Sequence, residues 1–182
     1  MPIPVGTYYQ KKELGNGTVA TIENNVVDTV TAGEEINFGV AVNIKDGKAV
    51  TATSAPIMGI AIKRNRIDGD DYNALPDDKF KAGELIGVLR KGGISVPITT
   101  DVSRYDFATV NSDGTFKTAG AGDGVVGRFK TDGYAGKTAI VQVELTDMGI
   151  TAPASDNSSS NNNQPTTKQD TQPTTTDKGG KQ

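Results

Sequence analysis

The stretch Ile36-Asn37-Phe38-Gly39-Val40-Ala41-Val42-Asn43-Ile44 places an apolar residue at every second position. Residues two apart in a β-strand share a face, so this alternation predicts extended chain with one buried side. Asp46-Gly47, a dipeptide that accepts the backbone angles of a tight turn, follows this stretch and precedes Ala49-Val50-Thr51. The segment therefore predicts a β-hairpin and indicates a mainly β fold.

Short β-forming segments closed by turn residues continue along the chain. They are Thr18–Ile22, Val26–Val30, Ile57–Lys63 and Lys137–Leu145. A second hairpin is predicted from Leu85 to Val96, with Gly92-Gly93 as its turn. Residues 65–81 read as a polar surface loop with one short helical turn near Asp77–Lys81. No long helix is expected, so the predicted fold is all-β, a compact single domain of short antiparallel strands, barrel-like or sandwich-like.

Two parts of the chain resemble one another. Val40-Ala41-Val42, Asp46-Gly47, Thr51-Ala52 and Gly59 correspond in order to Phe107-Ala108-Thr109, Asp113-Gly114, Thr118-Ala119 and Gly127. The pattern indicates either a duplication or the ordinary likeness of two hairpins that share an Asp-Gly turn.

The two ends of the chain differ in composition from the middle. Pro2 and Pro4 favour extended conformations, so residues 1–10 are expected to form an extended N-terminal arm. Residues 11–150 are expected to form the β-rich domain, which can bury a core without disulfides or metals. Residues 151–182 contain no Leu, Ile, Val, Phe, Tyr or Met and are expected to be a disordered tail. That tail is either a solvated tether or an extension without a role.

The composition excludes several classes of function. The chain contains no Cys, His or Trp, which removes thiol nucleophiles, Cys/His zinc sites and Ser-His-Asp catalysis. The net charge of −3 gives no electrostatic reason to expect nucleic acid, and no apolar run is long enough to span a membrane. The first residues resemble no export signal, so we expect synthesis and retention in a cytoplasm. We predict no enzymatic activity, no cofactor, no metal, and no binding to nucleic acid or membranes.

Three short motifs resemble binding sites without completing them. Gly122–Gly127 matches G-x-G-x-x-G, but the residues after it cannot form the helix that a pyrophosphate site requires. Gly136-Lys137-Thr138 resembles the end of a P-loop, yet Thr131 stands where the first glycine belongs. Asp68-Gly69-Asp70-Asp71 opens like a calcium loop but lacks the glycine and glutamate of an EF-hand. A looser calcium site and a solvated acidic loop remain alternatives there.

Three segments resemble the structural cement proteins, or capsid decoration proteins, of tailed bacteriophages. They are Gly6–Tyr9, the step from Val26 to Glu34, and Val50–Ala61. The resemblance extends over about Pro2 to Leu145 and leaves out the tail. It implies a β-rich virion protein that binds the outside of the mature capsid, often as a homotrimer, and stabilises contacts between major capsid subunits. It implies synthesis in the host bacterial cytoplasm and no catalytic residue or cofactor.

The arm is the expected interface with the capsid or with a neighbouring subunit. Apolar and Tyr side chains in an arm lack a local core, and the interface residues are therefore predicted as Pro2, Ile3, Pro4, Val5, Tyr8 and Tyr9. Alternatively, Tyr8 and Tyr9 begin the first strand and are buried within the domain.

A second function stays open, that of a β-sandwich or barrel module displayed on the virion that binds carbohydrate or a cell surface. The absence of Trp opposes it, because sugar sites use exposed aromatic faces. One exposed patch of Tyr72, Tyr105 and Tyr134 would favour it.

Overall fold

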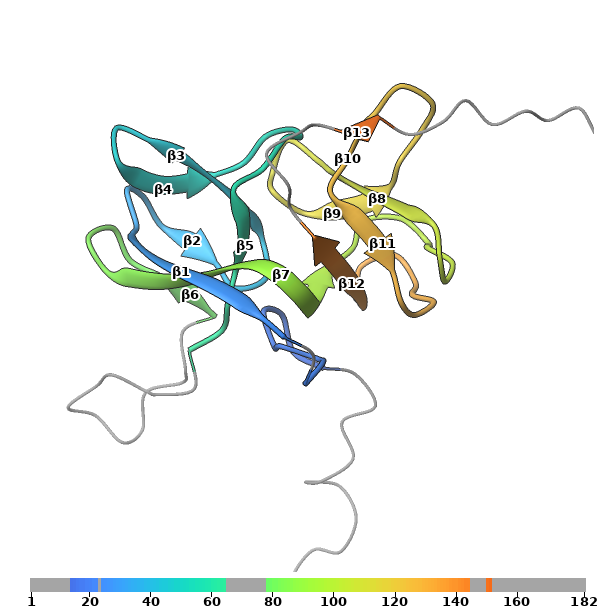
Figure 1. The fold of residues 1–182 in the computed structure, drawn as a ribbon, viewed down its shortest axis with the longest axis horizontal. Helices are drawn as coiled ribbons and strands as arrows, with labels where there is room; N and C mark the ends of the chain where they lie inside the picture. Colours follow the sequence, from blue (N-terminus) through green and yellow to red (C-terminus); the bar gives the residue numbers. More distant parts are fainter. Residues whose placement is uncertain (1–13, 23, 65–77, 145–149, 152–182) are drawn as a thin grey trace, which may run out of the picture.

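The computed structural model describes residues 14–22, 24–64, 78–144 and 150–151, and these residues form strands and turns without a helix (Figure 1). The strands are β1 (Val26–Thr31), β2 (Ile36–Asn37), β3 (Ala41–Lys45), β4 (Lys48–Thr51), β5 (Gly59–Ala61), β6 (Lys79–Phe80), β7 (Leu85–Pro97), β8 (Phe107–Val110), β9 (Phe116–Thr118), β10 (Gly124–Val125), β11 (Gly127–Phe129), β12 (Thr138–Glu144) and β13 (Ile150–Thr151). The described part of the chain therefore offers no helix that could cross a membrane.

Nine of these strands form one curled antiparallel sheet that resembles half a barrel (Figure 1). The order is β4-β3-β5-β7-β12-β11-β8-β9, and β1 pairs with β7 outside this path. β7 is the central strand, because its first half pairs with β1 and β5 and its second half pairs with β12. Two small sheets, β2–β6 and β10–β13, complete the fold. The prediction of an all-β fold is confirmed.

The hairpin at Asp46-Gly47 is also confirmed. Lys45 pairs with Lys48, and the turn residues Asp46 and Gly47 have φ values of 51° and 74°. Positive φ at both central residues is the signature of the two-residue turn that matches the twist of a hairpin. The alternating stretch before this turn is, however, divided between β2 and β3, because Gly39 at φ 78° bends the chain between them.

The predicted hairpin with a turn at Gly92-Gly93 is wrong, because both glycines lie inside the continuous strand β7. A Cβ atom on Gly93 would lie 2.5 Å from Cγ2 of Thr21, and one on Gly92 would collide with Oδ1 of Asn25. The glycines thus leave room for the segment that precedes β1 to cross β7. Glycine within a strand often marks such a place, where another part of the chain approaches the strand closely.

Two further expectations need correction. The expected helical turn near Asp77–Lys81 is instead β6, which pairs Phe80 with Ile36, while residues 65–77 lie outside the described part of the chain. The segment Thr18–Ile22 forms no full strand. Only Val19 makes a bridge, to Ile94 of β7.

The two halves of the domain repeat one pattern of strand pairing. The first half consists of β1, β3, β4, β5 and the first half of β7. Each has a counterpart in the second half, in the same order: the second half of β7, β8, β9, β11 and β12. Corresponding strands pair with corresponding neighbours. The parallel bridge Ala32–Ala49 in the first half corresponds to Ile98–Phe116 in the second. The weak sequence repeat thus belongs to a structural repeat, in which β7 contributes one strand to each half.

Matching backbone hydrogen bonds extend this correspondence into the loops. Gly83 N–H donates to Ala32 O at 2.8 Å, and Gly136 N–H donates to Ile98 O at 2.9 Å. The pairing of Ile36 with Phe80 in the first half likewise corresponds to that of Val102 with Gly133 in the second.

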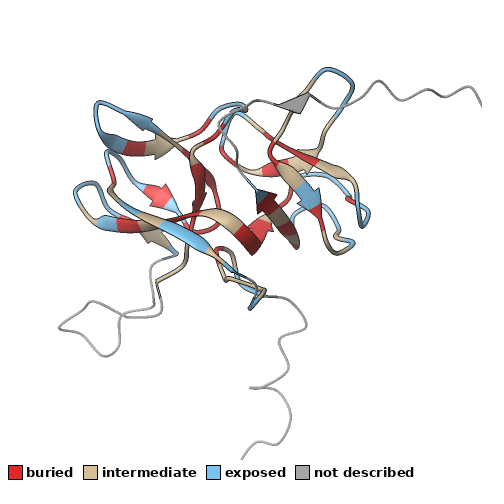
Figure 2. Ribbon diagram, viewed as in Figure 1, coloured by how far each residue is buried: buried red, intermediate tan, exposed pale blue. Residues whose placement is uncertain are grey.

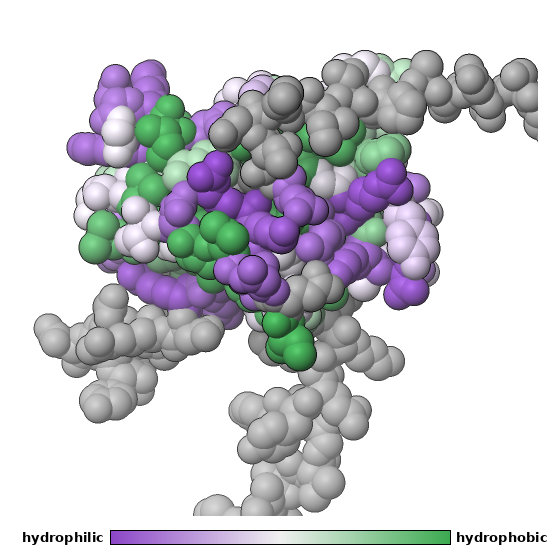
Figure 3. All heavy atoms as spheres, viewed as in Figure 1, coloured by the Kyte–Doolittle hydropathy of each residue, from purple (hydrophilic) through white to green (hydrophobic). Residues whose placement is uncertain are grey.

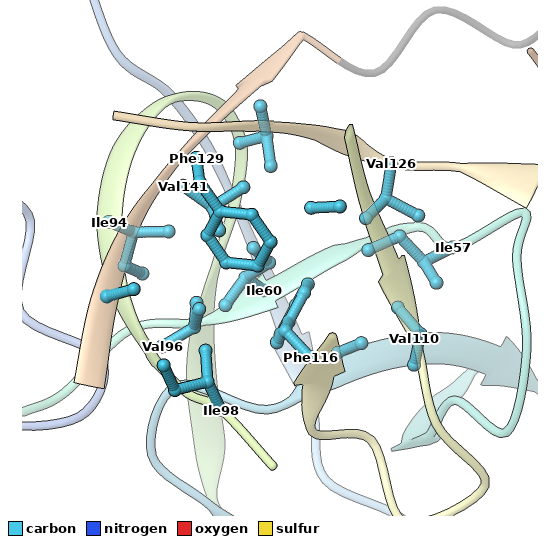
Figure 4. Packing of buried hydrophobic residues seen from close by; sticks show 14 of the residues in the cluster. Ile57, Ile60, Ile94, Val96, Ile98, Val110, Phe116, Val126, Phe129 and Val141 are labelled. Carbon is cyan, nitrogen blue, oxygen red and sulfur yellow. The ribbon is translucent and has the colours of Figure 1, made fainter. Parts of the chain in front are cut away.

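Each half contributes to a hydrophobic core. The smaller cluster surrounds Phe38 and Phe80, whose rings pack edge to face with centroids 4.9 Å apart. The larger cluster surrounds Phe116 and Phe129, both fully buried (Figure 4). Buried residues concentrate along β5, β7 and β12, whereas β1 is half exposed and the tip of the β3–β4 hairpin is exposed (Figure 2).

Candidate interaction surface

The six predicted interface residues, Pro2, Ile3, Pro4, Val5, Tyr8 and Tyr9, lie outside the described residues. The first residue that the structure describes is Leu14. Its carbonyl oxygen accepts hydrogen bonds from Ser95 Oγ at 3.1 Å and from Thr138 Oγ1 at 3.0 Å. The chain is therefore fixed to β7 and β12 at its first described residue.

Two loops beside this point present exposed aromatic side chains. One loop precedes β8 and contains Arg104 and Tyr105, and the other joins β11 to β12 and contains Tyr134 (Figure 1). The side chain of Tyr105 is 68% exposed and that of Tyr134 is 77% exposed. We call Arg104, Tyr105 and Tyr134 the Tyr105 surface.

The two loops are held together by hydrogen bonds of their backbones. Val102 and Gly133 exchange two of them, at 2.9 and 3.0 Å. Asp132 Oδ1 accepts from the N–H of Arg104 at 2.8 Å, and Asp101 Oδ1 accepts from the N–H of Ala135 at 2.8 Å. These bonds leave the loops little freedom to rearrange.

Arg104 and Tyr105 are fixed individually as well. Arg104 Nε donates to the carbonyl oxygen of Lys130 at 2.8 Å, and its guanidinium carbon lies 5.9 Å from the centroid of the Tyr105 ring. The N–H of Tyr105 donates to Phe129 O at 2.8 Å. A cation over an aromatic face is a favourable contact, so the guanidinium helps to orient the ring.

Tyr105 has a φ of 75°, in the left-handed region that side chains disfavour. Its counterpart in the first half of the domain is Gly39, with φ 78°, whose N–H donates to Ala61 O as that of Tyr105 donates to Phe129 O. Gly39 is buried beneath Gly17, whose nitrogen lies 2.6 Å from the position of a Cβ atom on Gly39. The same left-handed backbone position thus holds a covered glycine in one half of the domain and an exposed tyrosine in the other.

Within the described residues, no group of three His, Cys, Asp or Glu side chains could hold a metal ion. The acidic stretch Asp68–Asp71 lies outside these residues. Gly122–Gly127 contributes to β10 and β11, and Gly136-Lys137 forms the turn into β12, in accord with the reading of both as links between strands.

Three carboxyl groups have a lowered pKa, and all three are explained by local hydrogen bonds. A backbone N–H of Lys81 lowers the pKa of Glu84, the hydroxyl of Thr115 lowers that of Asp113, and the Lys91 side chain lowers that of Glu144. These groups belong to separate turns and strands and do not form one cluster of carboxylates.

Comparison with protein families identifies the chain. A family model described as "Structural cement protein (E217 gp24/Pam3 gp6)" matches residues 5–146. The chain belongs to the phage structural cement protein family. Membership gives it a structural role in the virion, at the capsid, and confirms the resemblance read from the sequence.

Among solved structures, the cement protein is similar to the N base of head fiber gp8.5 of bacteriophage phi29. The similarity has a TM-score of 0.45 at 15% identity and covers 71% of this chain and 100% of the other. No curated protein sequence matches.

The sequence named Tyr105 and Tyr134 only for the alternative function and did not single out Arg104. The third residue of that expected patch, Tyr72, lies outside the described part of the chain. A signal for Tyr105 was present in the internal repeat. However, the sequence match pairs Val40 with Phe107, whereas the strand registers pair Val42 with Ala108. The match is therefore one residue out of register here and would place Asp106, and not Tyr105, opposite Gly39.

Proposed function

We propose that this cement protein binds the outer surface of the mature phage capsid and stabilises contacts between neighbouring major capsid subunits. The observation that carries the proposal is the family match, which spans nearly the whole β-rich domain and begins within the arm, at residue 5. A protein that binds the assembled shell better than its alternatives shifts the equilibrium toward the shell. Stabilisation then follows from binding alone and requires no catalytic group.

The arm is proposed as the primary foothold, through Pro2, Ile3, Pro4, Val5, Tyr8 and Tyr9. The anchored carbonyl of Leu14 supports this role, because a load on the arm passes directly to β7 and β12. We further propose that the protein acts as a homotrimer, since three weak footholds on one particle raise its avidity by orders of magnitude. In this proposal it is made in the host bacterial cytoplasm and binds neither nucleic acid nor membranes.

Co-sedimentation with mature heads that lack the protein tests the proposal. The full chain, a chain without residues 1–6 and a chain that ends at Thr151 are compared over a range of concentrations. We expect saturable binding of the full chain and of the chain that ends at Thr151, and strongly weakened binding without residues 1–6. Absence of saturable binding by the full chain would contradict the proposed function.

A second candidate function is carbohydrate binding by a module displayed on the virion. The exposed rings of Tyr105 and Tyr134 on adjacent loops favour it. Binding of the purified chain to glycans or host cell walls, with no binding to heads, would select this function.

A further inference from the structure

We propose that the Tyr105 surface is the part of the folded domain that binds the capsid, with Tyr105 inserted into a pocket of a major capsid subunit. The inference rests on the proposed function, because it names a second contact with the same partner. It is nevertheless separate from the arm, since all three residues belong to the described domain.

The first argument is the strained backbone of Tyr105. A bulky residue at positive φ costs free energy that glycine avoids, and such strain is found mainly at functional sites. The repeat shows that this fold accepts glycine here, because Gly39 occupies the corresponding position with nearly the same φ. A tyrosine that is 68% exposed makes too few contacts within the domain to offset the cost.

The second argument is the covering of the corresponding site in the first half. Gly17 closes over Gly39 and donates its N–H to Ser95 O at 2.8 Å. No described residue covers Tyr105 in the same way, and its ring projects outward beside Arg104. As far as the described residues extend, the position that Gly17 fills in the first half is therefore open to a partner in the second.

The third argument is location. Leu14 is bound to Thr138, and the turn that contains Tyr134 directly precedes Thr138, with the N–H of Lys137 donating to Tyr134 O at 3.0 Å. Leu14, the first described residue, and the Tyr105 surface thus lie at the same end of the domain. A partner that holds the arm would also meet Tyr105.

The chemistry of the surface favours a protein as its partner. Tyr and Arg are the residues most enriched in the energetic centres of protein interfaces. The Arg104 guanidinium lies over one face of the Tyr105 ring and so leaves only the other face for stacking with a sugar. Within the Arg104 guanidinium, Nε donates to an acceptor and the two terminal nitrogens have none among the described residues. The terminal nitrogens can therefore donate to a partner. We therefore expect a capsid pocket with an apolar wall and carboxylate or carbonyl oxygens at its rim.

The surface is also organised before binding. The hydrogen bonds of Asp132, Lys130 and Phe129 fix the backbone and the guanidinium. Figure 3 shows many hydrophilic side chains on the right-hand part of the face in view, where Figure 1 draws β11 and the β11–β12 turn. Binding to preformed side chains loses less conformational entropy than binding to loose ones. A single aromatic side chain can then contribute a large part of the binding free energy.

The decisive variant is Tyr105→Gly, which copies the residue of the first half. We expect its melting temperature to be equal to or above that of the wild type, because the strain is relieved. We expect its affinity for mature heads to fall by about tenfold or more, as for the central residue of an interface. Ile44→Ala, which shortens a 44% exposed side chain at the tip of the β3–β4 hairpin, is the control and should bind like the wild type.

Head binding is measured by co-sedimentation of the full chain and its variants, and melting by the loss of near-ultraviolet circular dichroism. If Tyr105→Gly melts lower than the wild type, Tyr105→Asn replaces it, since Asn tolerates the left-handed region. Wild-type affinity in a stable variant at position 105 would overturn the inference and leave the proposed function intact. Failure of the wild type to bind heads would overturn the proposed function itself, and binding of the wild type to glycans through Tyr105 would replace the capsid with a sugar.

Discussion

Gly93 shows how a single missing side chain can decide a local structure. It lies in the middle of β7, where a Cβ atom would approach Cγ2 of Thr21 to 2.5 Å. The N–H of Gly93 also donates to Thr21 Oγ1 at 3.0 Å, so the contact cannot simply open. The segment before β1 depends on this close approach for its path over the sheet.

Replacement of Gly93 by Ala should therefore destabilise the domain by about 1–3 kcal/mol, the usual cost of overpacking. Urea denaturation followed by circular dichroism measures the change. Gly120→Ala is the matched control, because only the Asp123 side chain lies near its Cβ position, at an ordinary contact distance of 3.5 Å. Equal stability of the two variants would show that the crossing segment is not packed against β7.

Asp113 makes a prediction about acid. Its pKa lies below the ordinary value of 3.8 because the hydroxyl and the N–H of Thr115 donate to its carboxylate. The folded state thus favours the charged form, and the added stability is present above the unfolded pKa and lost as the pH falls through the folded one. We expect Thr115→Val to reduce the loss of stability between about pH 4 and pH 2 by a few tenths of a kcal/mol, since the site is exposed.

Urea denaturation at several pH values gives this dependence for the wild type and for Thr115→Val. The backbone N–H of residue 115 is kept in the variant, so the effect isolates the hydroxyl. An unchanged slope below pH 4 would show that the hydroxyl does not hold the carboxylate in solution.

Among the described strands, β1 is an edge strand, whereas its counterpart in the second half is covered. The C=O of Gly87 accepts from Ile62 N–H at 2.8 Å, so Thr29, which lies opposite Gly87, directs its own N–H away from β7. The corresponding residue of the second half is Ser95, whose N–H donates to Thr18 O at 2.9 Å. The N–H of Ser95 thus has an acceptor, whereas the corresponding N–H of Thr29 has none among the described residues.

Amide hydrogen exchange should distinguish the two. We expect the N–H of Thr29 to exchange orders of magnitude faster than that of Ser95, because exchange from a bonded, buried group requires opening of the structure. Residue-resolved nuclear magnetic resonance of the free protein provides the rates. Equal protection of both groups would contradict the open edge.

The local patterns predicted the elements that local chemistry determines. The turn at Asp46-Gly47 and the strands β1 and β12 follow from turn residues and alternation within a few positions. The continuous strand β7 could not be predicted, because Gly92 and Gly93 serve a contact with Thr21 and Asn25, which is invisible in a local window. Likewise, Lys79–Phe80 became a strand through its pairing with residues 36 and 37, far away in sequence.

The candidate site shows the same division. The family resemblance gave the capsid as partner, and the arm as foothold stays a prediction. Tyr105 gained its meaning only from the three-dimensional repeat, where its backbone matches that of Gly39. A strained φ and an arginine over the ring cannot be read from residue order.

At the scale of the whole molecule, the described chain begins at one end of the sheet, with Leu14 bound to β7 and β12, and the proposed arm precedes this end. Leu14, the β11–β12 turn and the loop before β8 lie together there, whereas the β3–β4 hairpin lies at the opposite end (Figure 1). Under the proposed function, this arrangement places the arm and the Tyr105 surface where one capsid could meet both.

The measurement that tests this account most directly is the temperature at which mature heads lacking the protein release their DNA, with and without added protein. A DNA-binding dye reports the release. We expect saturating protein to raise this temperature. The chain without residues 1–6 and the Tyr105→Gly variant should raise it less at equal concentration, and Ile44→Ala should act like the wild type. Saturable binding without any rise in the release temperature would contradict the claim that the protein acts as capsid cement.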